Sequence, residues 1–170
     1  PISWTLWCAP DLLLAQTCGL PYRARLAGRV SLVGTPDFGL PGCAPGWYRS
    51  VYVVRQSDAA QDLDALRAPR FALNEPLSQS GWAGPAAHFA ATGRVFGPRV
   101  VTGSHAGSAH AVAAGTADLA AIDAQTWQTG VALATRLGLP SLMYTINIRA
   151  LDGEKGTITV ERLLEQGRQV

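Results

Sequence analysis

The chain has 170 residues, of which 48% are apolar and 15% charged, and its formal net charge is +2. This composition is typical of a folded globule with one or two compact lobes and excludes a disordered chain. The net charge is too small to indicate a nucleic-acid or anionic-membrane partner, and no apolar run approaches the roughly 20 residues of a membrane-spanning helix. The N-terminus lacks the basic-then-apolar pattern of a signal peptide, so we expect a processed chain or an internal fragment.

The N-terminal third is predicted to contain one helix and two strands. Residues 3–19 favour a helix that ends at Gly19. Residues 29–33 indicate a short strand, followed by a turn-rich stretch at 34–46. The strongest strand signal of the chain is at residues 50–55, which are rich in β-branched and aromatic side chains.

Three cysteines, Cys8, Cys18 and Cys43, are too few for a disulfide framework, and their spacing matches no zinc pattern. One interpretation pairs Cys18 with Cys43, which an exported protein would allow. The other leaves all three as reduced thiols that pack as small apolar side chains. Their spacing alone does not decide between the two.

The middle of the chain alternates between strand and helix patterns. After a helical turn at 62–66, strands are predicted at 70–74, 98–102 and 119–122, and helices at 80–92 and 105–114. Ser78 or Ser80 is expected to cap the first of these helices, which Gly93 ends, and Gly115 ends the second. This β-α-β-α-β order predicts a parallel sheet with covering helices.

The C-terminal part has weaker patterns. Strands are predicted at 131–134 and 142–148, and a terminal helix at 160–166. The whole sequence contains no internal repeat, low-complexity tract or block of charge.

A first candidate site lies where the strand at 70–74 gives way to the helix at 80–92. A helix N-terminus presents free backbone N–H groups and about half a positive charge, so it attracts anions. The hydroxyls of Ser78 and Ser80 add donors, and Gly81 would let a ligand oxygen approach the backbone closely. The alternative is an ordinary serine N-cap with no ligand.

A second candidate site has the same geometry at residues 102–108. Here His105 lies in the first turn of a helix, where it can donate a hydrogen bond to an anion, and Ser108 lies one turn along the same face. A solvent-facing histidine on a capped helix is the alternative. Both junctions follow parallel strands, and the carboxyl ends of such strands are where open α/β sheets bind ligands.

Three further side chains are candidates for the same edge. Asp123 ends the strand at 119–122, where its carboxylate could accept a hydrogen bond from a P–OH or a cationic group, or could cap the following segment. Tyr48 precedes the strand at 50–55, where its phenol could reach a ligand. Thr17 closes the first helix with a polar side chain that could line a cleft, although a simple glycine C-cap explains that stretch nearly as well.

Together these stretches resemble the periplasmic phosphate-, phosphite- and phosphonate-binding proteins of ABC transporters, which have the type II periplasmic-binding fold. The resemblance extends over roughly residues 4–127, and the stretches that carry it are residues 11–22, 46–55, 78–81, 103–108 and 117–123. It implies an α/β protein with two lobes built on parallel-rich sheets. Lobe one would comprise residues 1–55 and 123–170, and lobe two residues 56–122. Lobe one is expected to be incomplete, because the strand, helix and strand that begin these proteins have no counterpart here.

The resemblance also implies a function and its contacts. The protein would bind a small oxyanion between its lobes in the periplasm and deliver it to the membrane permease of the transporter, without a cofactor and without nucleic acid. The contacts carried over are Tyr48, Ser78, Gln79, Ser80, His105 and Asp123. The family often has threonine where this chain has Gln79, so the identity of the oxyanion stays open.

The main alternative is an enzyme, a serine hydrolase that uses Ser80, His105 and Asp123. Triads occur in several chain orders, but the Gly-x-Ser-x-Gly pattern of a nucleophile elbow is missing here. We therefore expect a binding protein and not an enzyme. Two further alternatives are a protein of the same fold that binds another metabolite, such as a pyrimidine or thiamine precursor, and a degenerate domain that has lost its ligand.

Overall fold

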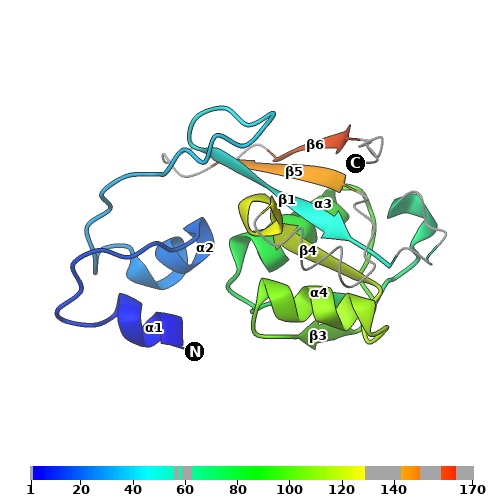
Figure 1. Ribbon diagram of the computed structural model, residues 1–170, viewed down its shortest axis with the longest axis horizontal. Coiled ribbons are helices and arrows are strands. Elements are labelled where there is room, and N and C mark those ends of the chain that lie inside the picture. Colours follow the sequence, from blue (N-terminus) through cyan, green and yellow to red (C-terminus); the bar gives the residue numbers. More distant parts are fainter. Residues whose placement is uncertain (1, 56–57, 59–62, 129–142, 150–157, 164–170) are drawn as a thin grey trace.

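The computed structural model describes residues 2–55, 58, 63–128, 143–149 and 158–163. Within them, six strands form one sheet in the order β3-β2-β4-β1-β5-β6 (Figure 1). In chain order the elements are α1 (Ile2–Trp7), α2 (Gly19–Pro21), η1 (Tyr22–Leu26), β1 (Trp47–Val53), η2 (Leu63–Ala65), β2 (Phe71–Leu73), η3 (Gln79–Ala83), α3 (Gly84–Ala91), β3 (Arg99–Val101), α4 (His105–Ala113), β4 (Leu119–Asp123), β5 (Met143–Arg149) and β6 (Ile158–Leu163). No helix in this described part is long and apolar enough to cross a membrane.

The sheet is mixed. Strand β2 runs parallel to its neighbours β3 and β4, as the β-α-β-α-β pattern predicts. Strand β1 is antiparallel to β4 on one side and to β5 on the other, and β6 is antiparallel to β5. Because Ser50 pairs with Asp123, the start of β1 lies beside the end of β4.

Two apolar clusters cover the two faces of the sheet, because successive side chains of a strand point to opposite faces. Val51 and Val53 of β1 pack on the face covered by α4, where they belong to the same buried cluster as Val112. Tyr52 and its neighbours on the other face meet Phe89 of α3. The helices α3 and α4 therefore lie on opposite sides of the sheet (Figure 1).

Asp118, just before β4, joins the ends of several elements. Its carboxylate accepts hydrogen bonds from the Arg70 guanidinium, at 2.6 and 3.0 Å, and from the Arg70 backbone N–H at 3.0 Å. It also accepts from Arg55 at 3.2 Å, and the same arginine donates to carbonyls at the end of α4 and in the turn that follows. The hydrogen bonds from Arg70 hold the pKa of Asp118 well below its usual range.

The N-terminal predictions are wrong in two places. The helix predicted at 3–19 ends at Trp7, because Pro10 has no N–H to donate and restricts the residue before it. The strand predicted at 29–33 is reduced to one bridge between Ala27 and Val30. Between these two residues Gly28 turns the chain with a φ of +78°.

The central predictions are confirmed, and one at the C-terminus is wrong. The strands at 70–74, 98–102 and 119–122, both helices between them and the turn at 62–66 are all present, with bounds shifted by a few residues. Residues 158–163 form β6 instead of a helix, because pairing with β5 overrides the local preference of residues 160–163. The strand predicted at 131–134 and the last residues of the terminal helix lie outside the described residues.

Strand β1 lies at one proposed domain boundary, and that boundary stays a prediction. The prediction treats residues 50–55 as a connection that leads from lobe one into lobe two. Four residues of β1 pair with β4, so the sheet that contains residues 71–123 already begins at Trp47. The division into two lobes likewise stays a prediction. The bridge between Cys18 and Cys43 that the sequence leaves open is not formed, because Cys8, Cys18 and Cys43 are all reduced thiols.

Candidate functional site

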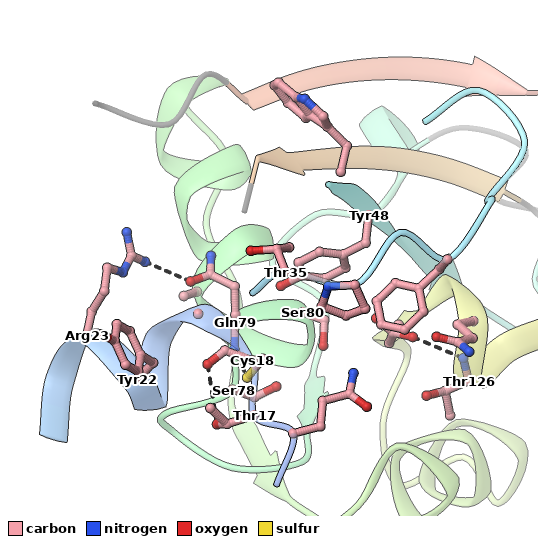
Figure 2. Close-up of a pocket in the computed structure, with 18 of the residues that line it drawn as sticks. Thr17, Cys18, Tyr22, Arg23, Thr35, Tyr48, Ser78, Gln79, Ser80 and Thr126 are labelled. Carbon is pink, nitrogen blue, oxygen red and sulfur yellow. Dashed lines mark hydrogen bonds between the residues drawn. The ribbon is translucent and has the colours of Figure 1, made fainter. Parts of the chain in front are cut away.

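A cavity of about 790 Å³ lies at the edge of the sheet where β2 and β4 end (Figure 2). One wall comes from the N-terminal segment between Trp7 and Phe38. The opposite wall comes from the start of β1, the helix start after β2, the first residue of α4 and the end of β4. This is the carboxyl edge of the parallel strands, where the sequence predicts a binding site.

Both predicted junctions are capped helix N-termini. Ser78 has an extended backbone, and its Oγ accepts the backbone N–H of Gly81 at 2.9 Å. Ser104 does the same for Gly107 at 2.9 Å at the start of α4. These caps begin the helices next to the cavity, so the partial positive charge of both helix starts lies near it.

Ser80 and His105 meet across the two helix starts. Ser80 Oγ and His105 Nε2 are 3.2 Å apart, and the Ser80 carbonyl is held by the hydroxyl of Ser50 at 3.1 Å. Burial lowers the pKa of His105, while the charge of Asp123 and the nearby Ala121 carbonyl act in the opposite direction. We therefore take the imidazole to be neutral near pH 7, with one ring nitrogen that donates and one that accepts.

Three buried polar atoms on residues that line the cavity have no hydrogen-bond partner among the described residues. They are the Tyr48 hydroxyl, Asn74 Oδ1 and His105 Nδ1. Buried polar groups are nearly always paired, so several such atoms around one cavity indicate a place for a ligand or water. Burial raises the pKa of Tyr48 well above its ordinary value, with the neighbouring Cys18 and Asp123 acting in the same direction. The phenol therefore keeps its proton and can donate it.

Asp123 lines the cavity but does not orient the histidine. Its Oδ1 accepts the backbone N–H of Thr126 at 3.0 Å, which is the capping role considered from the sequence. His105 Nδ1 makes no hydrogen bond to it. A catalytic triad requires a carboxylate bonded to that nitrogen. Ser80, His105 and Asp123 are thus brought to one cavity without forming a triad.

Seven of the eight predicted site residues line the cavity: Thr17, Tyr48, Ser78, Gln79, Ser80, His105 and Asp123. Gly81, the eighth, has a different role. Its amide is occupied by Ser78, and a methyl group at its Cα would overlap the side-chain carbonyl of Asn74. Glycine is therefore needed there for packing and not for the approach of a ligand. Ser108 also turns away from the cavity, since its buried hydroxyl contacts Thr102 Oγ1 at 2.7 Å.

Asn74 and Arg23 are two of the cavity residues that were missed from the sequence. Asn74 comes directly after β2, and Asp123 is the last residue of β4. Asp123 was selected because ligands bind at the carboxyl ends of parallel strands, and the same reasoning could have found Asn74. Arg23 lies in no motif, and its guanidinium donates to Gln79 Oε1 at 2.8 Å only because the fold brings the two segments together. No group of His, Cys, Asp and Glu side chains that could hold a metal occurs in the described part of the chain.

Comparison with known proteins decides the family. A profile described as "ABC transporter, phosphonate, periplasmic substrate-binding protein" matches residues 28–138, more than half of the chain. The chain belongs to this family. The matched region of this phosphonate-binding family member includes Tyr48, the serines after β2, His105 and Asp123, whereas Thr17, Cys18 and Arg23 precede it. The resemblance stated from the sequence is thus confirmed.

A solved structure and a search of curated proteins complete the comparison. The chain is similar to PhnD1 from Prochlorococcus marinus (MIT 9301), which was solved in complex with methylphosphonate, with 23% identity and a TM-score of 0.46. The alignment covers 55% of this chain and 39% of PhnD1, so the family member described here spans well under half of that protein. No curated protein matches the sequence.

Proposed function

We propose that the chain is the extracytoplasmic solute-binding component of an ABC transporter and that it binds a phosphonate- or phosphate-like oxyanion in the cavity. The observation that carries this proposal is the convergence of the Ser80–His105 pair and the buried, unpartnered Tyr48 hydroxyl on one cavity at two helix starts. Membership of the phosphonate-binding family supports the choice of anion.

Hydrogen-bond donors suited to an oxyanion surround this point. The Ser80 backbone N–H lies in the first turn of η3, where helix N–H groups have no intrahelical partner. In the Ser80–His105 pair one group donates to the other, so the pair presents one further proton to a ligand, and the Tyr48 phenol can donate another. Hydrogen bonds to charged groups are stronger than those between neutral groups, which favours an ionised ligand here.

The carboxylates of the cavity restrict the charge of that ligand. Asp123 and Glu75 both line it, against one arginine, Arg23. A fully ionised oxyanion close to Asp123 would be repelled, whereas a P–OH group or an amine would donate a hydrogen bond to it. A singly protonated phosphonate or phosphate therefore fits better than sulfate, which carries no proton near neutral pH.

The absence of an oriented carboxylate at His105 argues against hydrolysis by Ser80, so we propose binding without catalysis. The membrane permease of an ABC transporter would be the partner that takes the ligand from the cavity. The family's description as periplasmic supports a location outside the cytoplasm.

Ligand-dependent stability tests the proposal directly. Methylphosphonate, phosphite, phosphate and sulfate would be compared by thermal shift and by calorimetry at equal ionic strength. A ligand at 100 times its Kd stabilises the native state by about 2.7 kcal/mol, which for a chain of this size raises Tm by roughly 5–10 °C. We expect this shift with at least one phosphorus oxyanion and little with sulfate. If none of the four anions raises Tm, the proposal is contradicted.

Tyr48→Phe should separate affinity from stability. Removing a buried hydroxyl that has no partner is expected to leave the empty protein as stable as before or to stabilise it by up to about 1 kcal/mol. Anion binding should weaken about 5- to 20-fold, because the phenol no longer donates. Chemical denaturation and calorimetry measure the two effects. Lower stability with unchanged affinity would mean that the hydroxyl has a structural partner and does not reach the ligand.

A further inference from the structure

The N-terminal segment contacts Gln79 through both the main chain and the side chain of that residue. Cys18 Sγ accepts the Gln79 backbone N–H at 3.4 Å. Arg23 donates from Nη2 to Gln79 Oε1 at 2.8 Å (Figure 2). Gln79 is the first residue of the helix that begins at the cavity, so both contacts cross from one cavity wall to the other.

These contacts commit Gln79 to the N-terminal segment. Its amide N–H is occupied by the thiol, whose pKa is raised by burial, so that the sulfur stays protonated and is a weak, neutral acceptor. Its side-chain carbonyl is turned to Arg23, on the left in Figure 2, whereas Ser80 lies toward the centre of the cavity. Gln79 therefore joins the two walls of the cavity. Its neighbours Ser78 and Ser80, in contrast, are suited to hold an anion.

The N-terminal wall needs such an attachment. Residues 8–18 and 31–40 form no helix or strand, so few backbone hydrogen bonds hold their shape. Inside this wall, the Trp7 indole donates to the Gln16 carbonyl at 3.0 Å, which ties α1 to the stretch that carries Thr17. The contacts at Gln79 then fix this stretch relative to the helix start on the other wall.

We infer that Gln79 and Arg23 form a latch that positions the Thr17–Cys18 wall over the anion site. The latch is defined as the hydrogen bond between the Arg23 guanidinium and the Gln79 side chain. Gln79 is thus a positioning residue and not a ligand contact. The inference rests on the proposed function, because it assigns the latch a role in holding the bound anion.

Three variants and a charge-matched control test the latch. Arg23→Ala and Gln79→Met each remove the hydrogen bond, and the second keeps the length of the side chain and the net charge. Each is expected to weaken methylphosphonate binding about 2- to 10-fold, mainly through faster dissociation. The double variant should be no weaker than either single one, because both remove the same contact. Arg29→Ala removes one positive charge from the same segment outside the cavity and should leave binding unchanged.

Hydrogen exchange provides a readout that needs no ligand. Amides of residues 19–27 should exchange faster in Arg23→Ala and Gln79→Met by a similar factor, and at the wild-type rate in Arg29→Ala. Gln79→Glu keeps an acceptor for Arg23 and should restore slow exchange. Ser80→Ala should lower affinity without changing exchange in this segment.

The outcomes separate the latch from the proposed function. Additive losses in the double variant, or slow exchange in Gln79→Met, would overturn the latch. If the wild-type protein binds none of the anions while exchange still responds to both latch variants, then the proposed function fails and only the structural part of the latch stands. A loss of binding without any change in exchange would instead make Gln79 a direct ligand contact.

Discussion

Replacing Ser80 and His105 together by alanine is expected to weaken binding of the phosphorus oxyanion about 100-fold. Each single replacement should cost about 1–2 kcal/mol, because each removes one member of the hydrogen-bonded pair that presents a proton to the charged ligand. The two losses should not add fully, since Ser80 Oγ and His105 Nε2 are 3.2 Å apart and interact with each other. Binding need not vanish, because the Ser80 backbone N–H and the Tyr48 hydroxyl remain.

Calorimetry on the single and double variants measures these losses, and circular dichroism checks that the fold is kept. Ser108→Ala is a matched control. It removes a hydroxyl from α4, the helix of His105, and this hydroxyl faces Thr102 instead of the cavity. Its affinity should equal that of the wild type. If the double variant binds as tightly as the wild type, the anion does not lie between the two helix starts.

Asp118→Ala should be the most destabilising change, lowering the free energy of unfolding by about 2–4 kcal/mol and Tm by roughly 5–15 °C. The loss arises because Asp118 accepts from both Arg55 and Arg70 and also from a backbone N–H, and its side chain is only 26% exposed. Asp58→Ala is the control. It removes a separate ion pair of the same Arg55, so its effect should stay under about 1 kcal/mol.

The same carboxylate predicts a pH dependence. Because the pKa of Asp118 is lowered in the folded state, its contribution is present above the unfolded-state value near 3.8 and is lost as pH falls below that value. Urea denaturation between pH 6 and pH 2.5 should show wild type and Asp118→Ala converging at the acidic end. A constant difference across this range would mean that the carboxylate charge has no part in the stability.

The central part of the fold could be predicted because each boundary has a local cause. A serine cap begins each helix beside the cavity, and a glycine with positive φ follows each helix end, as at Gly93 and Gly115. Local patterns also predicted that Ser80, His105 and Asp123 lie at one edge of the sheet, because each comes at or after the carboxyl end of a parallel strand.

What could not be predicted depends on contacts between distant segments. The pairing of β1 with β4 and the meeting of Arg23 with Gln79 join residues far apart in sequence, and no local pattern encodes either. Cysteine spacing says nothing of the distance between two thiols in space, so the Cys18–Cys43 pairing stayed undecided until the fold was known. Strand β6 shows the same limit, since its partner β5 determines its conformation.

The pairing of β1 with β4 has a consequence for how the protein folds. Ser50 and Asp123 are neighbours in the sheet although more than 70 residues separate them in the chain. Contacts of such long range form late, because the entropy of closing a long loop is lost before the contact is gained. Tyr48 and Asp123 therefore come together only when this pair closes, so a partly folded chain presents no complete cavity. Under the proposed function, folding must therefore be complete before the ligand can bind.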